Sequence, residues 1–260
     1  VIVPAAGVPR APLVAHVPHA SVSIPARVRA ELLVSDVELR GELLRLTDWH
    51  TDALFAGLAA AGATRFVNRL SRLVFDPERF LDDSAEPAAA SGQGVVYWRT
   101  SSGGRLRKED PELRERRIEE LYRPYHAALD GLVGELLDAF GSCTVIDCHS
   151  FPTEPLPTEV PDDGGRPDIC IGTDPVHTPE GLAAGLEGAL RGAGLAVRRD
   201  VPFAGAFVPS GFYGRERRVH SVMIEVRRGL YMDEASGERS TSFEAVAAAI
   251  VGAVESALPL

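Results

Sequence analysis

The sequence predicts an α/β fold in which a mixed, mostly parallel sheet carries helices on both faces. Apolar runs of strand length alternate with stretches of helical periodicity, and this alternation is typical of such sheets. The 260 residues are 45% hydrophobic and 25% charged, so the chain can bury a sizeable core and is ordinary for a globular protein. This length fits one large α/β domain or two small ones.

Six apolar runs have the length and composition of buried strands, and no fixed-period repeat connects them. They cover residues 12–17, 64–70, 143–148, 167–172, 195–199 and 219–226. Because the runs are separated by helical stretches, several of the strands should be parallel.

Helical periodicity covers residues 37–46, 51–61, 110–140, 179–193 and 242–256. Gly62 is a good C-terminal stop for the second of these stretches. The third begins with Asp110 as a favourable N-cap and Pro111 at the first helical position. Pro124 should kink or divide this long helix, because proline lacks the N–H that a helix interior needs.

Two long segments are expected to be loops. Residues 81–105 are rich in Gly, Ser and Ala, with one candidate hairpin at "GVVYW". Residues 151–166 contain four prolines, at positions 152, 155, 157 and 161, and so cannot form regular structure. Long loops in compact domains are usually functional. The second loop begins directly after His149 and Ser150, so it should overhang whatever His149 does.

Charge and cysteine content exclude several classes of protein. A net charge of −10 argues against a nucleic-acid partner but allows a small anionic substrate held by local arginines. No apolar run approaches the roughly 18 residues of a membrane span, and no signal peptide is evident. Cys143, Cys148 and Cys170 have no paired spacing, which argues against disulfides or a four-cysteine zinc site. A cytoplasmic location is therefore expected.

Residues able to bind metals or transfer protons recur where apolar runs end. His19 follows the first run, Asp48 and His50 occur in "LTDWHTD", His149 closes the third run, and Glu225 lies inside the last. In a parallel sheet the carboxyl ends of the strands meet at one edge, where α/β enzymes place their sites. Two histidines and a carboxylate form many catalytic zinc sites, and a further carboxylate then acts as general base.

Each of these residues also has a purely structural interpretation. An isolated histidine near a strand end is often only a hydrogen-bonding group. Glu225 has apolar neighbours that imply a buried strand, where an ionised carboxylate needs a partner, and a salt bridge to Arg227 or another arginine is the simple alternative. Asp147 lies two residues before His149 on the same strand face, where it can orient the imidazole from behind.

Six segments in order resemble the N-formylglutamate amidohydrolase family: "PLVAHVPHASVSIP", "LTDWHTDALF", "SRLVFDPERF", "VIDCHSF", "PDICIGT" and "VHSVMIEVRRGLYMDE". Together they span roughly residues 12 to 234. The family is similar to zinc carboxypeptidases in fold, so the resemblance implies a single catalytic domain over residues 1–260. It also implies a zinc-dependent hydrolase of the formyl amide of an acidic amino acid.

The resemblance further implies roles for individual residues. His19 and His149 correspond to metal ligands, and the third ligand is a carboxylate that we assign to Asp48, with His50 as the rival two residues away. Glu225 corresponds to the general base and acid of carboxypeptidase-like enzymes. The expected cofactor is one divalent metal ion, Zn²⁺ before cobalt, iron or manganese, which the same ligands accept.

The substrate-binding residues are expected near a family pattern that this chain alters. The usual Asp-Leu-Asn-Arg appears as Asp76-Pro77-Glu78-Arg79. Arg79 would grip the substrate carboxylate, with Arg72 as a second candidate anion-binding residue, because guanidinium groups suit carboxylates. Glu78 in place of Asn puts a negative charge beside Arg79, unless it turns outward.

Two further residues and two rival functions complete the expectations. Tyr213 and Arg215, in a glycine-bounded loop, are candidates to contact the substrate or its developing oxyanion. One rival function keeps the site but cleaves another N-acyl amino acid or a short peptide. The other is a non-catalytic binding protein on the same fold, although the presence of His19, His149 and Glu225 favours an enzyme.

Overall fold

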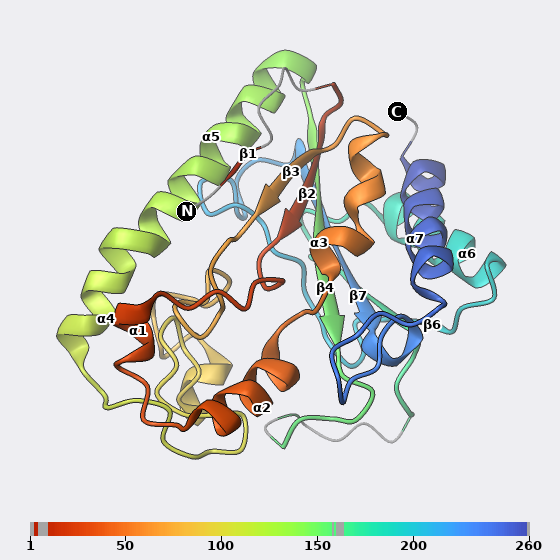
Figure 1. Ribbon diagram of the computed structural model, residues 1–260. Helices are drawn as coiled ribbons and strands as arrows, with labels where there is room; N and C mark the ends of the chain where they lie inside the picture. The colour runs from red at the N-terminus through yellow and green to blue at the C-terminus, as the bar shows by residue number, and fades with distance from the viewer. Residues whose placement is uncertain (1–2, 5–9, 158, 160–163, 259–260) are drawn as a thin grey trace.

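The computed structural model describes residues 3–4, 10–157, 159 and 164–258. A seven-stranded sheet forms the centre of the molecule, in the order β1-β3-β2-β4-β7-β5-β6, and helices cover both of its faces (Figure 1). The predicted α/β class with a mixed sheet is therefore confirmed.

The four central strands run in parallel. They are β3 (Thr64–Val67), β2 (Leu13–Val17), β4 (Cys143–Phe151) and β7 (Val219–Arg227). On one side β1 (Val3–Pro4) adds antiparallel to β3; on the other, β5 (Ile169–Gly172) adds antiparallel to β7 and carries β6 (Val197–Arg199) in parallel. The six predicted strands are all present, and β4 runs three residues further than predicted.

The two faces of the central strands bury separate apolar clusters. Successive side chains alternate between faces, and Leu13, Ile146 and Ile224 pack on one face against α3 (Thr51–Leu54), α6 (Glu180–Gly192) and α7 (Phe243–Ala257). On the other face Val14 and Val145 pack against α5 (Arg123–Phe140). Figure 1 shows α5 on one side of the sheet and α3, α6 and α7 on the opposite side.

Among the remaining helices, a start signal was predicted only for the one that begins at Pro111. α2 (Asp36–Leu46) begins with a capping box between Ser35 and Glu38, and α1 (Ala26–Arg29) is one turn long. α4 (Pro111–Arg117) is capped by Asp110, as predicted, and joins α5 through one π-helical turn over Ile118–Tyr122. This turn ends two residues before Pro124, so the predicted interruption of the long helix takes the form of a π-bulge.

The predicted helix over residues 51–61 is shorter than expected. It consists of α3 and a 3₁₀ turn over Ala56–Ala59. This turn packs so closely on α7 that a Cβ atom at Gly57 would lie 2.8 Å from Val251 Cγ2. Tertiary packing therefore sets the course of this segment more than its periodicity does.

The two predicted loops are largely irregular where the structure describes them. Residues 81–105 contain a 3₁₀ turn over Pro87–Ser91 and two isolated antiparallel bridges, Gln93 with Tyr97 and Arg99 with Arg105, in place of the strands of the candidate hairpin. In the second loop, residues 158 and 160–163, which include Pro161, lie outside the described residues. Across the described parts of the chain, no helix combines the length and apolarity needed to cross a membrane.

Candidate metal and active site

The candidate site lies at the carboxyl edge of the parallel strands. Register pairs His16 of β2 with Asp147 of β4, and His149 of β4 with Glu225 of β7. Because side chains alternate along a strand, these side chains lie on the sheet face that packs against α5. They lie nearer the carboxyl ends of the strands than the residues that α5 covers. His19 lies two residues after the end of β2. Sequence segments more than a hundred residues apart therefore meet here, as the strand-end pattern predicted.

His19 has one occupied and one unpaired ring nitrogen. Its Nε2 lies 2.8 Å from Asp76 Oδ1, which fixes the ring. Its Nδ1 is buried and has no hydrogen-bond partner among the described residues, although His19 is only 2% exposed. The nearest carboxylate atoms to this nitrogen are Asp48 Oδ2 at 3.7 Å and Glu78 Oε2 at 3.6 Å. An orphaned buried nitrogen facing two carboxylates is a suitable position for a metal ligand.

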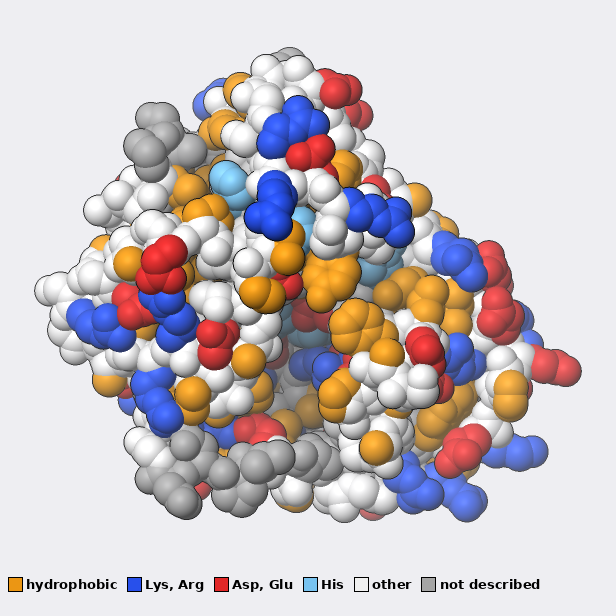
Figure 2. Space-filling view, turned by 180° about the vertical axis from the view of Figure 1, so that it is seen from behind, with side chains coloured by type: hydrophobic (Ala, Val, Ile, Leu, Met, Phe, Trp, Pro, Cys, Tyr) orange, Lys and Arg blue, Asp and Glu red, His pale blue; other side chains and the backbone are white. Residues whose placement is uncertain are grey.

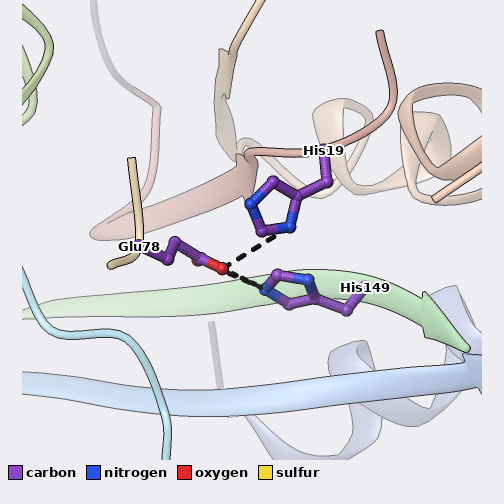
Figure 3. Close-up of side chains that lie close together, drawn as sticks. All are labelled: His19, Glu78 and His149. Atoms are coloured by element: carbon purple, nitrogen blue, oxygen red, sulfur yellow. Dashed lines mark hydrogen bonds and ion pairs between the residues drawn. The ribbon is translucent and has the colours of Figure 1, made fainter. Parts of the chain in front are cut away.

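His149 has a carboxylate at each ring nitrogen. Nδ1 lies 3.0 Å from Asp48 Oδ2, and Nε2 lies 3.2 Å from Glu78. Asp147 Oδ1 also lies 3.0 Å from Nε2, from its position two residues earlier on β4. Figure 3 shows the Glu78 carboxylate pointing between the rings of His19 and His149.

Two groups of side chains in the described residues have their ligand atoms within 4.8 Å of one another: His19, Glu78 and His149, and His16, Glu78 and Asp147. In the second group His16 has no spare nitrogen, because Nδ1 lies 2.9 Å from Asp147 Oδ1 and Nε2 lies 2.6 Å from the Tyr125 hydroxyl. The first group, with the unpaired His19 Nδ1, is therefore the better candidate for a cation.

The electrostatics of the cluster favour positive charge. Burial lowers the pKa of His149, but Asp147 and Glu78 outweigh burial and hold it well above its usual value. Burial and Arg72 lower the pKa of His19, yet Asp76 and Glu78 raise it overall. Imidazoles that retain protons in a buried place mark an excess of carboxylate charge. A divalent cation can replace those protons, since metal ligation requires neutral imidazole.

Two arginines hold the supporting carboxylates. Arg228, which follows β7, donates from Nη2 to Asp48 Oδ1 at 3.2 Å, so that Oδ2 is left for the histidines. Arg72 donates from Nε and Nη2 to Asp76 Oδ2, at 3.1 and 2.8 Å, while Asp76 Oδ1 holds His19. Burial would raise the pKa of Asp76, but Arg72 and His19 keep it well below its usual range.

Glu225 is a buried carboxylate that forms no ion pair within the described part of the chain. It is 9% exposed, and its Oε2 has no hydrogen-bond partner among the described residues. Arg227, its proposed salt-bridge partner, pairs with Asp168 instead. Burial raises the pKa of Glu225 to about 8, although the nearby His149 lowers it in part. A carboxylate that gains and loses a proton near neutrality is suited to acid–base chemistry.

A cavity of about 730 Å³ opens over these residues. His19, Asp48, Glu78, His149 and Glu225 all line it, and so do four arginines, Arg45, Arg72, Arg79 and Arg228. Phe151, Pro152, Leu156 and Glu159 also line it, so the proline-rich loop after His149 does border the site. Figure 2 shows the hollow near the middle of this face, with charged side chains inside it and apolar ones along its rim.

The arginines of the cavity differ in how far they are engaged. Arg72 donates hydrogen bonds to Asp76, to the Tyr97 hydroxyl and to the Leu46 carbonyl. Arg79 has looser contacts, at 3.5 Å from Asp76 and 3.8 Å from Glu86, and its Nε has no hydrogen-bond partner among the described residues. Arg79 is therefore the better placed of the two to take an anionic ligand.

Three predicted site residues lie apart from the cluster. His50 has a left-handed backbone and contacts the Gly237 carbonyl, 2.8 Å from its Nε2, so it faces away from the two histidines that Asp48 touches. Tyr213 is 52% exposed and stacks on His177. Arg215 lies in the same exposed turn, and neither it nor Tyr213 lines the cavity.

Three contributing residues were not recognised as such from the sequence: the inward-facing Glu78, Asp76 behind His19, and Arg228 behind Asp48. The altered "DPER" pattern was a signal for the first two, because both belong to it. Arg228 carried no signal of its own beyond lying three residues after Glu225.

Two imidazoles and acidic side chains at the carboxyl edge of a mixed sheet define a class: an α/β protein whose donor set is that of catalytic zinc sites. Comparison with known proteins supplies the particular family. The family model described as N-formylglutamate amidohydrolase matches residues 11–232, and the chain belongs to this family.

Its relatives cover nearly the whole chain. A protein of Pseudomonas aeruginosa described as N-formylglutamate deformylase is 30% identical over 260 residues, covering 96% of this chain and 93% of the relative. One of Pseudomonas putida with the same description is 29% identical, covering 86% and 83%. The crystal structure of N-formylglutamate amidohydrolase from Ralstonia eutropha superposes with a TM-score of 0.83 at 28% identity, covering 98% and 96%.

Proposed function

We propose that this protein is a metal-dependent amidohydrolase that cleaves the amide of an N-formyl, or other N-acyl, acidic amino acid such as N-formylglutamate. The observation that carries the proposal is the buried Glu225 carboxylate, whose Oε2 has no hydrogen-bond partner among the described residues and which lines one cavity with His19 and His149. Family membership and the description of the two Pseudomonas relatives support the choice of substrate.

His19, His149 and Asp48 are the proposed ligands of one divalent cation, with zinc as the expected ion. The residues fit such an ion, because His19 Nδ1 is orphaned and Asp48 Oδ2 faces both imidazoles. Asp76 would hold the His19 ring in its ligating tautomer, and Asp147, two residues before His149 on β4, would help to orient the His149 ring. When bound, the cation would lower the pKa of water and polarise the scissile carbonyl.

Glu225 is the proposed general base and then general acid. Its carboxylate takes a proton from the attacking water, whose oxygen bonds to the acyl carbon. As the carbon–nitrogen bond breaks, the same group gives the proton to the leaving amine. The products are a small acid, which is formate for a formyl substrate, and the free amino acid. A raised pKa suits both roles, because the group must be a base and an acid within one turnover.

Arg79 is the proposed partner of the substrate carboxylate. Its incompletely satisfied guanidinium lines the cavity, and a planar fork matches a carboxylate in geometry. Arg45 lines the same cavity with its side chain 46% exposed, so it offers a second positive group. Arg72 acts instead on Asp76 and orders the support of His19.

An activity assay with Glu225→Gln tests the proposal. The wild-type protein should release formate from N-formylglutamate, and a chelator should abolish the release. Glu225→Gln should retain one metal ion per chain but lose about 10²- to 10⁴-fold in kcat, as expected on removal of a general base. A variant that binds the metal and turns over at the wild-type rate would refute the role of Glu225.

The volume of the cavity favours a second candidate function. About 730 Å³ is within the range of roughly 300–1,000 Å³ that holds drug-sized ligands, and N-formylglutamate is smaller than these. An amidase or peptidase acting on a bulkier N-acyl amino acid or a short peptide would use the same site. Comparing kcat/KM for N-formylglutamate, N-acetylglutamate and glutamyl dipeptides separates the two functions.

The cytoplasmic location stays a prediction. It is supported by the three cysteines, which are buried and unpaired.

A further inference from the structure

Glu78 is the point at which this chain departs from the pattern of its family. A neutral asparagine is expected at this position, and the chain has a carboxylate instead. Two outcomes were expected: Glu78 faces the pocket beside Arg79, where its charge weakens or redirects substrate binding, or it turns outward. The structure has the first: Glu78 lines the cavity and faces the histidines (Figure 3), with its side chain only 13% exposed.

The charged partners of Glu78 are all histidines. Among the described residues its side-chain contacts are to His149 Nε2 at 3.2 Å, His16 Nδ1 at 3.5 Å and His19 Nδ1 at 3.6 Å. Arg79, next in the chain, contacts Asp76, Glu86 and Tyr97. Glu78 is therefore not neutralised by the arginine beside it.

The backbone holds Glu78 in this position. Its amide donates to Asp76 Oδ1 at 3.1 Å, the same oxygen that holds His19 Nε2. One buried carboxylate thus orders both the ring of His19 and the start of the Glu78 side chain. The position of Glu78 beside the histidines therefore depends on Asp76, the same residue that holds the His19 ring.

Two carboxylates flank the unpaired nitrogen of His19. Asp48 approaches from the Nδ1 side of His149, and Glu78 approaches from the Nε2 side. Both lie within 4 Å of His19 Nδ1, which is itself buried and without a hydrogen-bond partner. A cation bound at this nitrogen would have an acidic oxygen on either side.

We infer that Glu78 is a further protein ligand of the cation, in addition to His19, His149 and Asp48. The inference rests on the proposed function, because it concerns the same ion. A second carboxylate makes the donor set harder and raises the number of protein donors to four. Harder donors and higher coordination numbers favour ions such as Mn²⁺ relative to Zn²⁺.

Metal affinity, measured by chelator competition, tests the inference without reference to turnover. Glu78→Gln keeps the shape of the side chain, and Glu78→Asn restores the family's residue. Loss of an outer partner of a metal ligand typically costs about 10- to 100-fold in affinity, so loss of a direct ligand should cost at least about 100-fold. The loss should be larger for Mn²⁺ than for Zn²⁺.

Glu159→Gln is the matched control. Glu159 also lines the cavity, but it pairs with Arg166 and contacts no histidine. Its variant should bind metal as the wild type does. The visible absorption of the Co²⁺-loaded protein gives a second measurement, since it responds to the number and geometry of the donors. It should change in both Glu78 variants and stay unchanged in the control.

The outcomes separate the inference from the proposed function. Unchanged affinity and an unchanged Co²⁺ spectrum in Glu78→Gln and Glu78→Asn, with a wild type that binds metal, would overturn the role of Glu78 alone. A wild type that binds no divalent metal would overturn both. Weakened binding in the two Glu78 variants and not in Glu159→Gln would establish the ligand. Thermal unfolding of the metal-free variants shows whether they are folded.

Discussion

The two faces of strands β4 and β7 are buried to a similar degree and carry opposite chemistry. Cys148 and Ile224 belong to the apolar cluster under α3, α6 and α7. His149 and Glu225, one residue further along each strand, belong to the polar cavity on the other face. Adjacent residues on each strand therefore face different surroundings, an apolar core on one side and a charged cavity on the other.

A buried polar face requires a bonding partner for each of its groups. On the apolar face each side chain needs only a complementary shape. On the polar face nearly every group has a partner of its own, such as Asp76 for His19 and Arg228 for Asp48. The exceptions among the described residues of the site discussed above are His19 Nδ1, Glu225 Oε2 and Arg79 Nε. These unsatisfied atoms are where we place the cation, the proton transfer and the substrate carboxylate.

The largest effect should come from breaking the polar face at Asp48. Asp48→Asn removes the carboxylate charge that faces both imidazoles and leaves Arg228 without its anionic partner. We expect at least about 100-fold weaker metal binding, more than the loss of an outer partner would cause. Chelator competition measures the affinity.

His50→Asn is the control for that substitution. Asparagine tolerates the left-handed backbone of residue 50, so the fold should persist. Metal affinity should stay at the wild-type value, because His50 contacts Gly237 and not the cluster. If His50→Asn loses the metal while Asp48→Asn keeps it, His50 is the third ligand.

The sequence predicted the strands and most of the polar face because both depend on local patterns. Runs of apolar residues identify β4 and β7, and His149 and Glu225 interrupt those runs. The support of the site depends on contacts that no local pattern encodes. His19 and Asp76 are 57 residues apart, and Asp48 and Arg228 are 180 apart. The direction of the Glu78 side chain is likewise set by tertiary contacts.

A smaller effect concerns the stability of the metal-free protein. Glu225 has a pKa of about 8 when folded and about 4.5 as its usual value. Between these two pH values the folded state holds a proton that the unfolded state has released, so the free energy of unfolding falls as pH rises. Glu225→Gln removes this loss. The variant should gain on the order of a few kcal/mol over the wild type above pH 8.

Thermal unfolding of the two metal-free proteins at pH 5 and pH 9 checks this gain. The difference in Tm between variant and wild type should be small at pH 5 and should grow at pH 9. A bound cation near the carboxylate should reduce the difference. Equal differences at both pH values would show that the Glu225 carboxylate is as easily ionised in the folded chain as in the unfolded one.

The smallest effect should come from the apolar face, at the residue before Glu225. Ile224→Val removes one methylene from a side chain that is fully buried against the helices, on the side of β7 away from the cavity. Such a change typically costs about 0.5–1.5 kcal/mol, which lowers Tm by a few degrees in a chain of this size. Because the removed group faces away from His149 and Glu225, metal affinity and kcat should equal those of the wild type. A loss of kcat comparable to that of Glu225→Gln would mean that the two faces are mechanically coupled through the strand, and the site would then depend on the packing beneath it as well as on its own contacts.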